Sequence, residues 1–204
     1  ASGWVIGAPG DNAIRGIWER ANPEPTGAQP GDDHTPTGTL CYVTGPLAGT
    51  ALGDHDVDGG ARTLTSRSFD ALAQAGDPVL EYWYWYSNDQ GSSPGTDAWQ
   101  VSISNDAGAT WVIVEQTTSS TNAWARREVR IADHVTPTSQ IRLRFVARDD
   151  EPGGIIEAAV DDVALLFRGC PDAGCAADWD GSGGQPDSGD FLAYLNDWAA
   201  QEPD

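Results

Sequence analysis

Two short stretches of the chain place acidic side chains at alternate positions and follow them with glycine. Residues 54–60 read DHDVDGG, and residues 178–184 read DWDGSGG. Carboxylates packed this closely repel one another, and a bound cation is the simplest way to hold them together. Calcium suits such a loop because it takes about six to eight oxygen ligands, and glycine permits the sharp turn. We therefore predict calcium at both stretches.

The second stretch resembles the calcium loop of an EF-hand. The first, third and fifth loop positions carry oxygen ligands, and Gly183 falls at the sixth. The acid expected at the twelfth position is displaced by one residue, next to the start of a predicted helix. The predicted ligands are Asp178, Asp180, Ser182 and Asp190. The alternative is an acidic, solvated linker.

The first stretch matches only half of that pattern. Asp54, Asp56 and Asp58 are the predicted ligands, but the twelfth position is Thr65, so the remaining ligands must come from elsewhere. If successive strands run antiparallel, the loops near 7–15, 45–60, 87–98 and 148–154 meet at one end of the fold. They bring together Asp11, Asn88, Asp89, Asp97, Asp149, Asp150 and Glu151. The alternative is a set of turns in which Asp side chains bond to the backbone.

Further ligand candidates are fewer and less well defined. Asp11 and Asp97 belong to the loops that should meet. Asp161 and Asp162 fall inside the last predicted strand, shortly after Glu157. Acids inside a strand are unusual, so we expect one of this pair, with Asp162 as the candidate ligand, to face an Arg or a calcium ion.

Net charge narrows the classes of partner. The formal charge is −20, from 31 acids and 11 bases, and every base is Arg. Binding to nucleic acid needs a basic surface, so that class is excluded, as is attraction to anionic membranes.

No apolar run approaches the roughly 20 residues that cross a bilayer. The start at Ala1, without Met, fits a secreted chain cleaved from a signal peptide, although a trimmed chain would look the same.

Three cysteines bear on the compartment. Cys170 and Cys175 enclose four residues that turn readily, so we predict a small disulfide and an oxidising environment. Cys41 lies in a predicted strand. It is interpreted as a buried free thiol, with a bond to another chain or to the 170 region as the alternative.

Short alternating runs predict an all-β fold. In EYWYWYS, Tyr82, Tyr84 and Tyr86 should face one way and the two Trp the other, and IRLRFVAR alternates similarly. We predict ten strands and a jelly-roll β-sandwich over residues 1–169. They are residues 3–6, 16–20, 39–44, 63–69, 79–86, 99–105, 111–116, 123–131, 140–147 and 155–166.

The C-terminal part has a different character. Residues 170–177 predict a tether that contains the cysteine pair, and residues 178–204 predict a calcium loop followed by a helix. SGDFLAYLNDWAA has apolar residues at helical spacing, with Asp187 or Ser188 as the cap. The exposed apolar face of this helix, including Phe191, Leu195 and Trp198, predicts a protein partner.

No motif indicates catalysis. The three His residues form no zinc-binding spacing, and neither a nucleophile elbow nor a phosphate loop is present. A glycosidase needs only two carboxylates, but no pair stands in an apolar setting. We predict that the protein is not an enzyme. Nine Trp and five Tyr suggest sugar stacking, although most are placed like core residues of strands.

Two families are similar to the two parts of the chain. The segments GDNAIRGIWERANPEPTGAQPGDDHTP, DVDGGARTLTS, YWYWYSN, VSISNDAGATWV and IRLRFVARDDEPGGIIEAAVDDV resemble a jelly-roll domain of large secreted bacterial proteins, distantly like MAM domains. That domain often follows metallopeptidases, and the resemblance implies an accessory role. The tail CAADWDGSGGQPDSGDFLAYLNDWAA resembles one dockerin-type repeat. Dockerins carry two such repeats and bind cohesins.

These observations predict a secreted, non-catalytic, calcium-binding structural module at a cell surface or in an extracellular fibre. Its partners would be other protein subunits, either copies of itself or cohesin-like proteins, joined with the support of calcium. The alternative is a carbohydrate-binding module that targets a larger secreted hydrolase to a polysaccharide. An exposed row of Trp or Tyr on one sheet face would favour the alternative.

Overall fold

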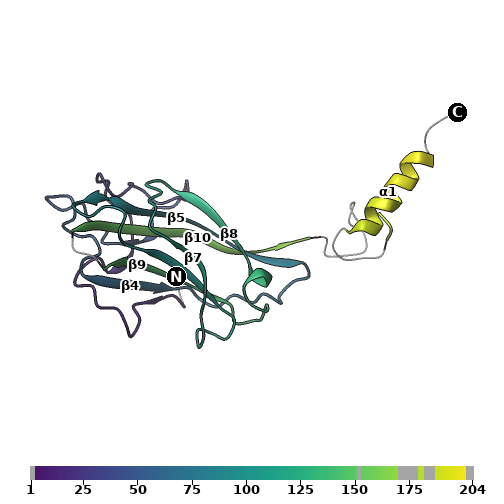
Figure 1. The fold of residues 1–204 in the computed structure, drawn as a ribbon, viewed down its shortest axis with the longest axis horizontal. Coiled ribbons are helices and arrows are strands. Elements are labelled where there is room, and N and C mark those ends of the chain that lie inside the picture. Colours follow the sequence, from purple (N-terminus) through teal and green to yellow (C-terminus); the bar gives the residue numbers. More distant parts are fainter. Residues whose placement is uncertain (1–2, 151–152, 170–178, 182–186, 201–204) are drawn as a thin grey trace.

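The computed structural model describes residues 3–150, 153–169, 179–181 and 187–200. Ten strands form two five-stranded antiparallel sheets that pack face to face (Figure 1). In spatial order, sheet A contains β1 (Val5–Ile6), β4 (Gly60–Thr65), β9 (Arg142–Asp149), β6 (Trp99–Ser104) and β7 (Val112–Thr117). Sheet B contains β2 (Trp18–Ala21), β3 (Cys41–Thr44), β10 (Gly154–Arg168), β5 (Asp77–Gly91) and β8 (Ala125–Arg130). The predicted jelly-roll β-sandwich is confirmed, and each predicted strand overlaps an observed one.

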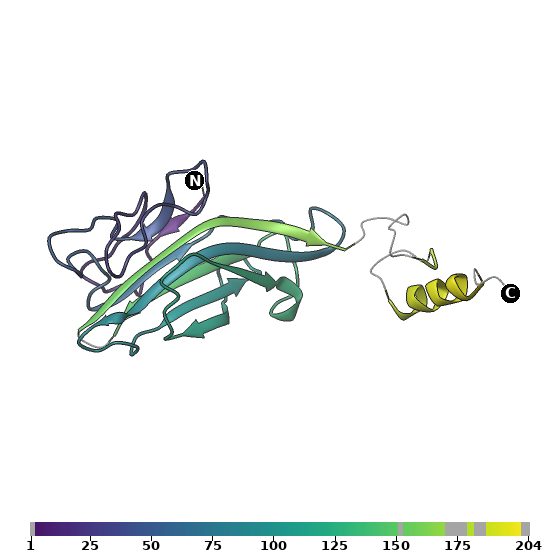
Figure 2. The ribbon, with the colours of Figure 1, turned by 90° about the horizontal axis from the view of Figure 1, so that it is seen from above.

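Two strands are longer than their sequence indicates. β5 and β10 have 15 residues each and pair antiparallel from Gly154 opposite Gly91 to Arg168 opposite Asp77. Figure 2 shows them bending together along the whole sandwich. Most of the added length is in β5, whose polar end at residues 87–91 lacks alternation and is held extended by pairing with β10. A 3-10 helix, η1 (Ile131–Asp133), occupies the end of the predicted eighth strand.

The core lies between the sheets, as the alternation predicts. Tyr82, Tyr84 and Tyr86 point into it and are at most 1% exposed, whereas Trp85 points to the opposite side of sheet B. From β9 the inward residues are Leu143, Phe145 and Ala147, preceded by Ile141. Burial of rings this large supplies most of the favourable free energy of folding.

Cys41 is a buried free thiol in β3. Burial raises its pKa to about 12. This confirms the interpretation of Cys41 as a small apolar residue of the interior. The predicted disulfide between Cys170 and Cys175 lies outside the described residues and stays a prediction.

A helix, α1 (Ser188–Ala200), follows beyond the end of β10 (Figure 1). It coincides with the predicted helix. Asp187 Oδ1 accepts a hydrogen bond from the Gly189 N–H at 2.6 Å, so Asp187 supplies the predicted cap. The described helices include none long and apolar enough to span a bilayer. The predicted division at residues 169, 170–177 and 178–204 stays a prediction, although β10 does end at Arg168.

Candidate functional site

The three acids of the DHDVDGG stretch point to three different places. Asp54 closes its own turn: one carboxylate oxygen accepts the Thr50 N–H at 2.7 Å, the Thr50 hydroxyl at 2.8 Å and the Ala51 N–H at 2.9 Å. The backbone N–H groups of Ala51 and Thr50 lower the pKa of Asp54 to about 2. This is the turn-forming role that was the alternative to calcium binding.

Asp56 lies beside β10 in the interior. It is 5% exposed, and its Oδ2 accepts the Ile156 N–H at 3.4 Å. Burial raises the pKa of Asp56 to about 7. The neighbouring Glu157 is also buried, and burial followed by repulsion from Asp56 raises its pKa to about 8. This acid pair was not predicted, because nothing in the sequence links two acids that are 101 positions apart.

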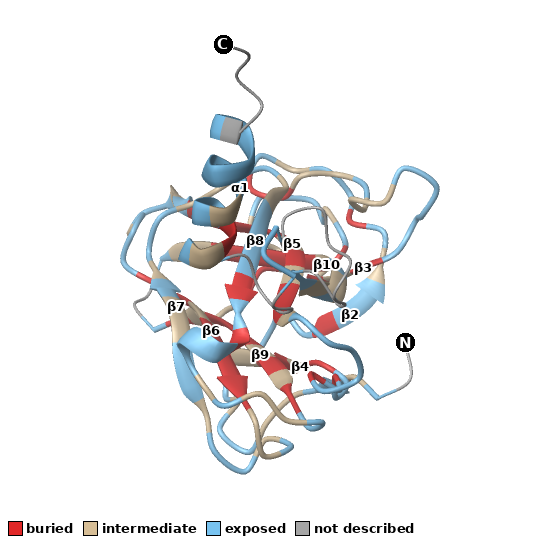
Figure 3. Ribbon diagram, turned by 90° about the vertical axis from the view of Figure 1, so that its right-hand side faces the viewer, coloured by how far each residue is buried: buried red, intermediate tan, exposed pale blue. Residues whose placement is uncertain are grey.

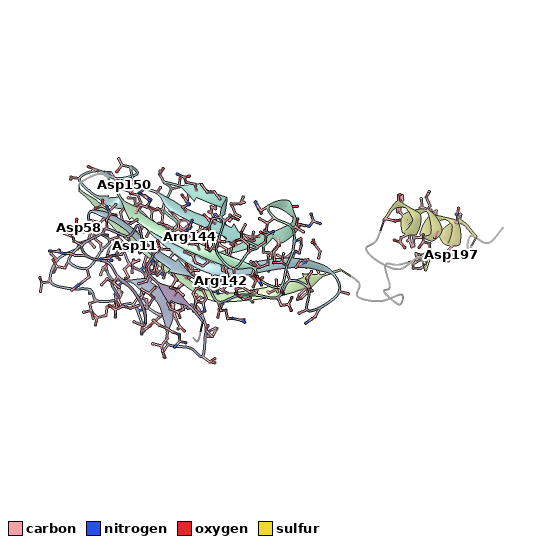
Figure 4. The ribbon with its side chains drawn as sticks, turned by 90° about the horizontal axis from the view of Figure 1, so that it is seen from below. Asp11, Asp58, Arg142, Arg144, Asp150 and Asp197 are labelled. Carbon is pink, nitrogen blue, oxygen red and sulfur yellow. The ribbon has the colours of Figure 1, made fainter. Side chains whose placement is uncertain are left out.

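Asp58 belongs to a third group, at the end of the sandwich opposite α1 (Figure 4). There it lines a hollow of about 280 Å³ with Asn12, Asp149 and Asp150. The Gly59 N–H donates to Asp149 Oδ2 at 2.8 Å, and the Asp150 N–H donates to Asp97 Oδ1 at 2.7 Å. The predicted meeting of these loops at one end of the sandwich is therefore confirmed. We call Asp58, Asp97 and Asp149 the acidic pole.

Two other ligand candidates are engaged elsewhere. Asp11 accepts the Thr63 hydroxyl at 2.6 Å and the Thr63 N–H at 2.9 Å, which ties its loop to β4. Asp162 bonds to His34 Nδ1 at 2.8 Å and accepts the Thr35 hydroxyl at 2.7 Å. Among the described residues, neither Asp161 nor Asp162 forms an ion pair with Arg, and the segment between β2 and β3 supplies their partners. Calcium at this pair, the other expected partner, stays a prediction.

In the tail, two predicted ligands come together. Asp190 is 6% exposed, and its carboxylate accepts the Asp187 N–H at 2.7 Å and the Asp180 N–H at 3.3 Å. A Cβ placed on Gly189 would lie 2.5 Å from Asp180 Oδ2, so both acids converge at the start of α1. Asp178 and Ser182 lie outside the described residues. Calcium binding at this loop stays a prediction.

The side chains as they stand do not form a complete metal site. Within the described parts of the chain, no three His, Cys, Asp or Glu side chains are grouped closely enough to hold an ion. Ligation by Asp54, Asp56 and Asp58 together, or with Asp11, Asp97 and Asp162, also stays a prediction. Their separate hydrogen-bond partners favour different roles for them.

The outer face of sheet B is covered by chain. Cys41, Val43, Trp85 and Ala159 form a second core there, with Ala21 and Trp124 packed against it. The His34 ring stacks on Trp83 with centroids 3.7 Å apart. Figure 3 shows buried segments in the central strands β5 and β10, whereas β8 and β2 are largely exposed. A broad ligand therefore finds little access to the part of this face around β3, β10 and β5.

The outer face of sheet A is open and polar. A hollow of about 290 Å³ lies on it, between β4, β9, β6 and the loop at residues 8–11. Figure 4 places Asp11, Arg144 and Arg142 along this face. The lining side chains that could contact a ligand are Asp11, Thr63, Gln100, Arg144, Val146 and Arg148. Their positions follow from the outward half of the β9 and β6 alternation.

Arg144 differs from its neighbours on β9. Arg148 makes a two-pronged contact with Asp150 at 2.8 and 3.0 Å, and Arg142 donates to the Ser68 hydroxyl at 2.9 Å. No ion pair among the described residues involves Arg144. Its Nε is buried without a hydrogen-bond partner, and its guanidinium carbon lies 4.3 Å from the centre of the Trp111 ring. Burial lowers the pKa of Arg144, and Asp11 opposes that effect.

The exposed row of rings that would indicate sugar stacking is not found on the described sandwich. Its strongly exposed apolar side chains are aliphatic, and the exposed rings Phe191, Trp179, Tyr194 and Trp198 belong to the tail. The stacking row named as the mark of the alternative function therefore has no counterpart among the described residues of the sandwich. The outward positions of IRLRFVAR were the signal that could have indicated the hollow.

No protein-family model and no curated protein matches this chain. Several solved structures are similar in fold. A family 61 carbohydrate-binding module in complex with β-1,4-galactotriose has a TM-score of 0.47 and 14% identity, with 82% of this chain and 90% of that chain covered. The K1 cleaved adhesin domain of Lys-gingipain from Porphyromonas gingivalis has a TM-score of 0.49 and 14% identity, over 83% and 93%.

A xylan-binding domain of carbohydrate-binding module family 22 is similar at a TM-score of 0.42 and 10% identity, covering 82% of this chain and 88% of that chain. All three scores are below 0.5. At that level the likeness carries no information about what this chain binds.

Proposed function

We propose that the sandwich is a non-catalytic, extracellular carbohydrate-binding module, and that an acidic polysaccharide lies across the outer face of sheet A. The observation that carries the proposal is Arg144. It is a cation without an ion-pair partner among the described residues, set in an open hollow of a chain whose net charge is −20. Arg144 shares this lack of an ion pair with other Arg side chains, namely Arg15, Arg20, Arg62, Arg67 and Arg142. It differs from them in that its Nε is buried without a hydrogen-bond partner.

The chemistry of the hollow suits a sugar with a carboxylate or sulfate group. A guanidinium offers planar, paired donors that match a carboxylate, and its weak hydration lowers the free-energy cost of contact. Gln100 adds an amide within the same hollow, whereas the Thr63 hydroxyl is taken by Asp11. The Trp111 ring contacts the Arg144 guanidinium, which restricts this side chain before a ligand binds. Few polar groups on a rigid sheet are enough to orient a ligand.

Affinity gel electrophoresis would test this proposal. The chain should migrate more slowly in gels containing polygalacturonate than in gels containing neutral xylan. Arg144→Ala should weaken the retardation at least tenfold. Arg130→Ala is the matched control, because Arg130 lies on β8 of the other sheet and pairs with Asp77 and Asp133. Equal retardation of the Arg144→Ala variant, or none with any acidic polymer, would overturn the proposal.

The absence of catalysis belongs to the same proposal and has its own test. Polygalacturonate incubated with the protein should show no increase in reducing ends. An increase in reducing ends that disappears when an acid of the hollow is substituted, as in Asp11→Asn, would show that the protein hydrolyses the polymer. The proposal of a binding module without catalysis would then be wrong.

A second function is favoured by one observation in the tail. α1 exposes Phe191 at 61% and Trp198 at 56%, so its apolar face lacks cover among the described residues. We propose that this face supports calcium-dependent association with a second protein subunit. Sedimentation velocity in millimolar calcium and in EGTA would test it, with Phe191→Ser and Trp198→Ser as variants. A monomer in both buffers would contradict self-association.

A further inference from the structure

The acidic pole joins three loops through hydrogen bonds to the backbone. Gly59 donates to Asp149, and the residue after Asp149 donates to Asp97. Asp97 and Asp149 are 1% and 4% exposed. Two carboxylates from distant parts of the chain are thereby held side by side, away from bulk water.

One oxygen of this pair has no partner. Asp149 Oδ2 accepts the bond from Gly59, but Asp149 Oδ1 is buried without a hydrogen bond. Burial of an oxygen that carries part of a negative charge, with no donor or cation beside it, costs considerable free energy. Such an atom therefore points to a ligand that the protein side chains do not supply.

Both carboxylates face one small space beside Gly154. A Cβ placed on Gly154 would lie 2.8 Å from Asp97 Oδ2 and 3.3 Å from Asp149 Oδ1. Any larger residue would fill the space between the two oxygens. The Tyr86 hydroxyl is also buried without a partner, and burial together with the charges of Asp97 and Asp149 raises its pKa.

The acids around this space repel one another. Burial raises the pKa of Asp149, and the charges of Asp97, Asp58 and Asp150 raise it further, against the Gly59 hydrogen bond. The nearest base on β9, Arg148, is taken by Asp150. Among the described residues, neither Asp58 nor Asp149 forms an ion pair with a basic side chain.

We propose that the acidic pole binds one calcium ion between Asp97 Oδ2 and Asp149 Oδ1, with Asp58 turning in from the adjoining hollow as a third ligand. Carboxylate oxygens at about 2.3–2.6 Å are what calcium prefers, and its flexible geometry tolerates ligands from separate loops. No His or Cys lines the hollow, which disfavours zinc. The site differs from the local Asp54, Asp56 and Asp58 set, because only Asp58 is shared.

A competing explanation needs no metal. Asp149 could hold a proton that it shares with Asp97, as paired carboxyl groups do. A calcium site predicts binding heat when calcium is added, whereas a shared proton predicts none, so calorimetry distinguishes the two explanations. The full chain should be stripped with EGTA and titrated with calcium chloride.

The tail loop would also contribute a calcium signal, so the parent for this experiment is Asp180→Ala. In that background the pole should still bind one calcium per chain. Adding Asp149→Asn should weaken the affinity at least tenfold, and Asp97→Asn should do the same. Adding Asp54→Asn is the matched control and should change little, because Asp54 serves its own turn. No calcium binding by the parent, or unchanged binding after Asp149→Asn, would overturn the proposal.

Thermal unfolding adds a readout that a damaged fold would not reproduce. In EGTA, Asp149→Asn should melt no lower than the parent, because an unpartnered buried charge has been removed. In calcium, the parent should melt at a higher temperature than in EGTA, and Asp149→Asn should not. If the melting temperature of the parent is the same in calcium and in EGTA, the shared proton is favoured.

Discussion

The guanidinium of Arg144 rests on the ring of Trp111, with its central carbon 4.3 Å from the ring centre. The contact crosses β6, the strand that separates β9 from β7 in sheet A. It positions, on an open face, a cation that forms no ion pair among the described residues. A flexible Arg would lose side-chain entropy on binding, and here the ring has already restricted it.

The Arg144→Lys variant should show whether binding depends on the planar shape of the guanidinium or only on its positive charge. Lys keeps the positive charge but lacks the planar fork of donors, so affinity for an acidic polysaccharide should fall roughly tenfold. The free energy of unfolding in urea should change by less than about 1 kcal/mol, since an exposed cation–π contact contributes about that much. Calorimetric titration with oligogalacturonate would measure the affinity. Unchanged binding would indicate plain charge attraction.

Two glycines in the loop before β4 should respond differently to alanine. Gly45 has φ +51°, and a Cβ there would lie 1.9 Å from the His55 carbonyl oxygen. Gly59 has φ +70°, but a Cβ there meets nothing within 4 Å. Gly59→Ala should therefore lower the free energy of unfolding by about 1 kcal/mol, the strain of positive φ alone.

Gly45→Ala should cost distinctly more than Gly59→Ala, because the backbone of residue 55 would have to move. Chemical denaturation of both variants in EGTA would compare them without any contribution from bound calcium. Equal losses would mean that the loop at residues 45–58 moves aside freely.

Glu157 should make stability fall as pH rises. Its folded-state pKa is raised from 4.5 to about 8 by burial and by Asp56. The folded state therefore binds more protons than the unfolded state between these values. This contribution to stability is fully present below pH 4.5 and is lost as pH rises through about 8. Its size is on the order of a few kcal/mol.

Glu157→Gln should remove the part of that dependence that Glu157 contributes, while Asp56, whose pKa burial raises to about 7, keeps its own part. Melting temperatures in EGTA between pH 5 and 9 would show a wild-type decline and a flatter variant, with the variant more stable at the alkaline end. Glu19→Gln, at an exposed position of β2, is the control and should follow the wild type. Parallel curves for wild type and Glu157→Gln would contradict the prediction.

Cys41 should not react with iodoacetamide in the native protein. The thiol is buried, and its pKa of about 12 leaves almost no thiolate at neutral pH. Peptide mapping after native and denatured alkylation would show the Cys41 label only in the denatured sample. The same maps would test the predicted disulfide between Cys170 and Cys175. Native labelling of Cys41 would mean that β3 opens readily.

The strands and the helix could be predicted from the sequence because the patterns that indicate them involve residues close together in the chain. EYWYWYS alternates residue by residue, and its Tyr and Trp side chains occupy opposite faces of β5 as expected. α1 coincides with the apolar helical spacing of SGDFLAYLNDWAA. The extra length of β5 could not be predicted from the sequence, because pairing with β10, and no local pattern, holds its polar end at residues 87–91 extended.

The grouping of the acids was harder to infer. Even spacing in DHDVDGG suggested that Asp54, Asp56 and Asp58 share one centre. The chain instead turns at Asp54 and is then pinned to β10 by the bridge between Val57 and Ile156. Each acid therefore meets a different neighbour.

By itself, the sequence determined the all-β architecture, the two faces of each strand and the terminal helix, because alternation and helical spacing arise between near neighbours. Only the tertiary structure decided which acids meet and which face stays open. Asp97 and Asp149 come together through loops that pack across the end of the sandwich. Sheet A stays open because the long segment after β2 covers sheet B instead. Contacts between distant segments depend on packing, which no local pattern encodes.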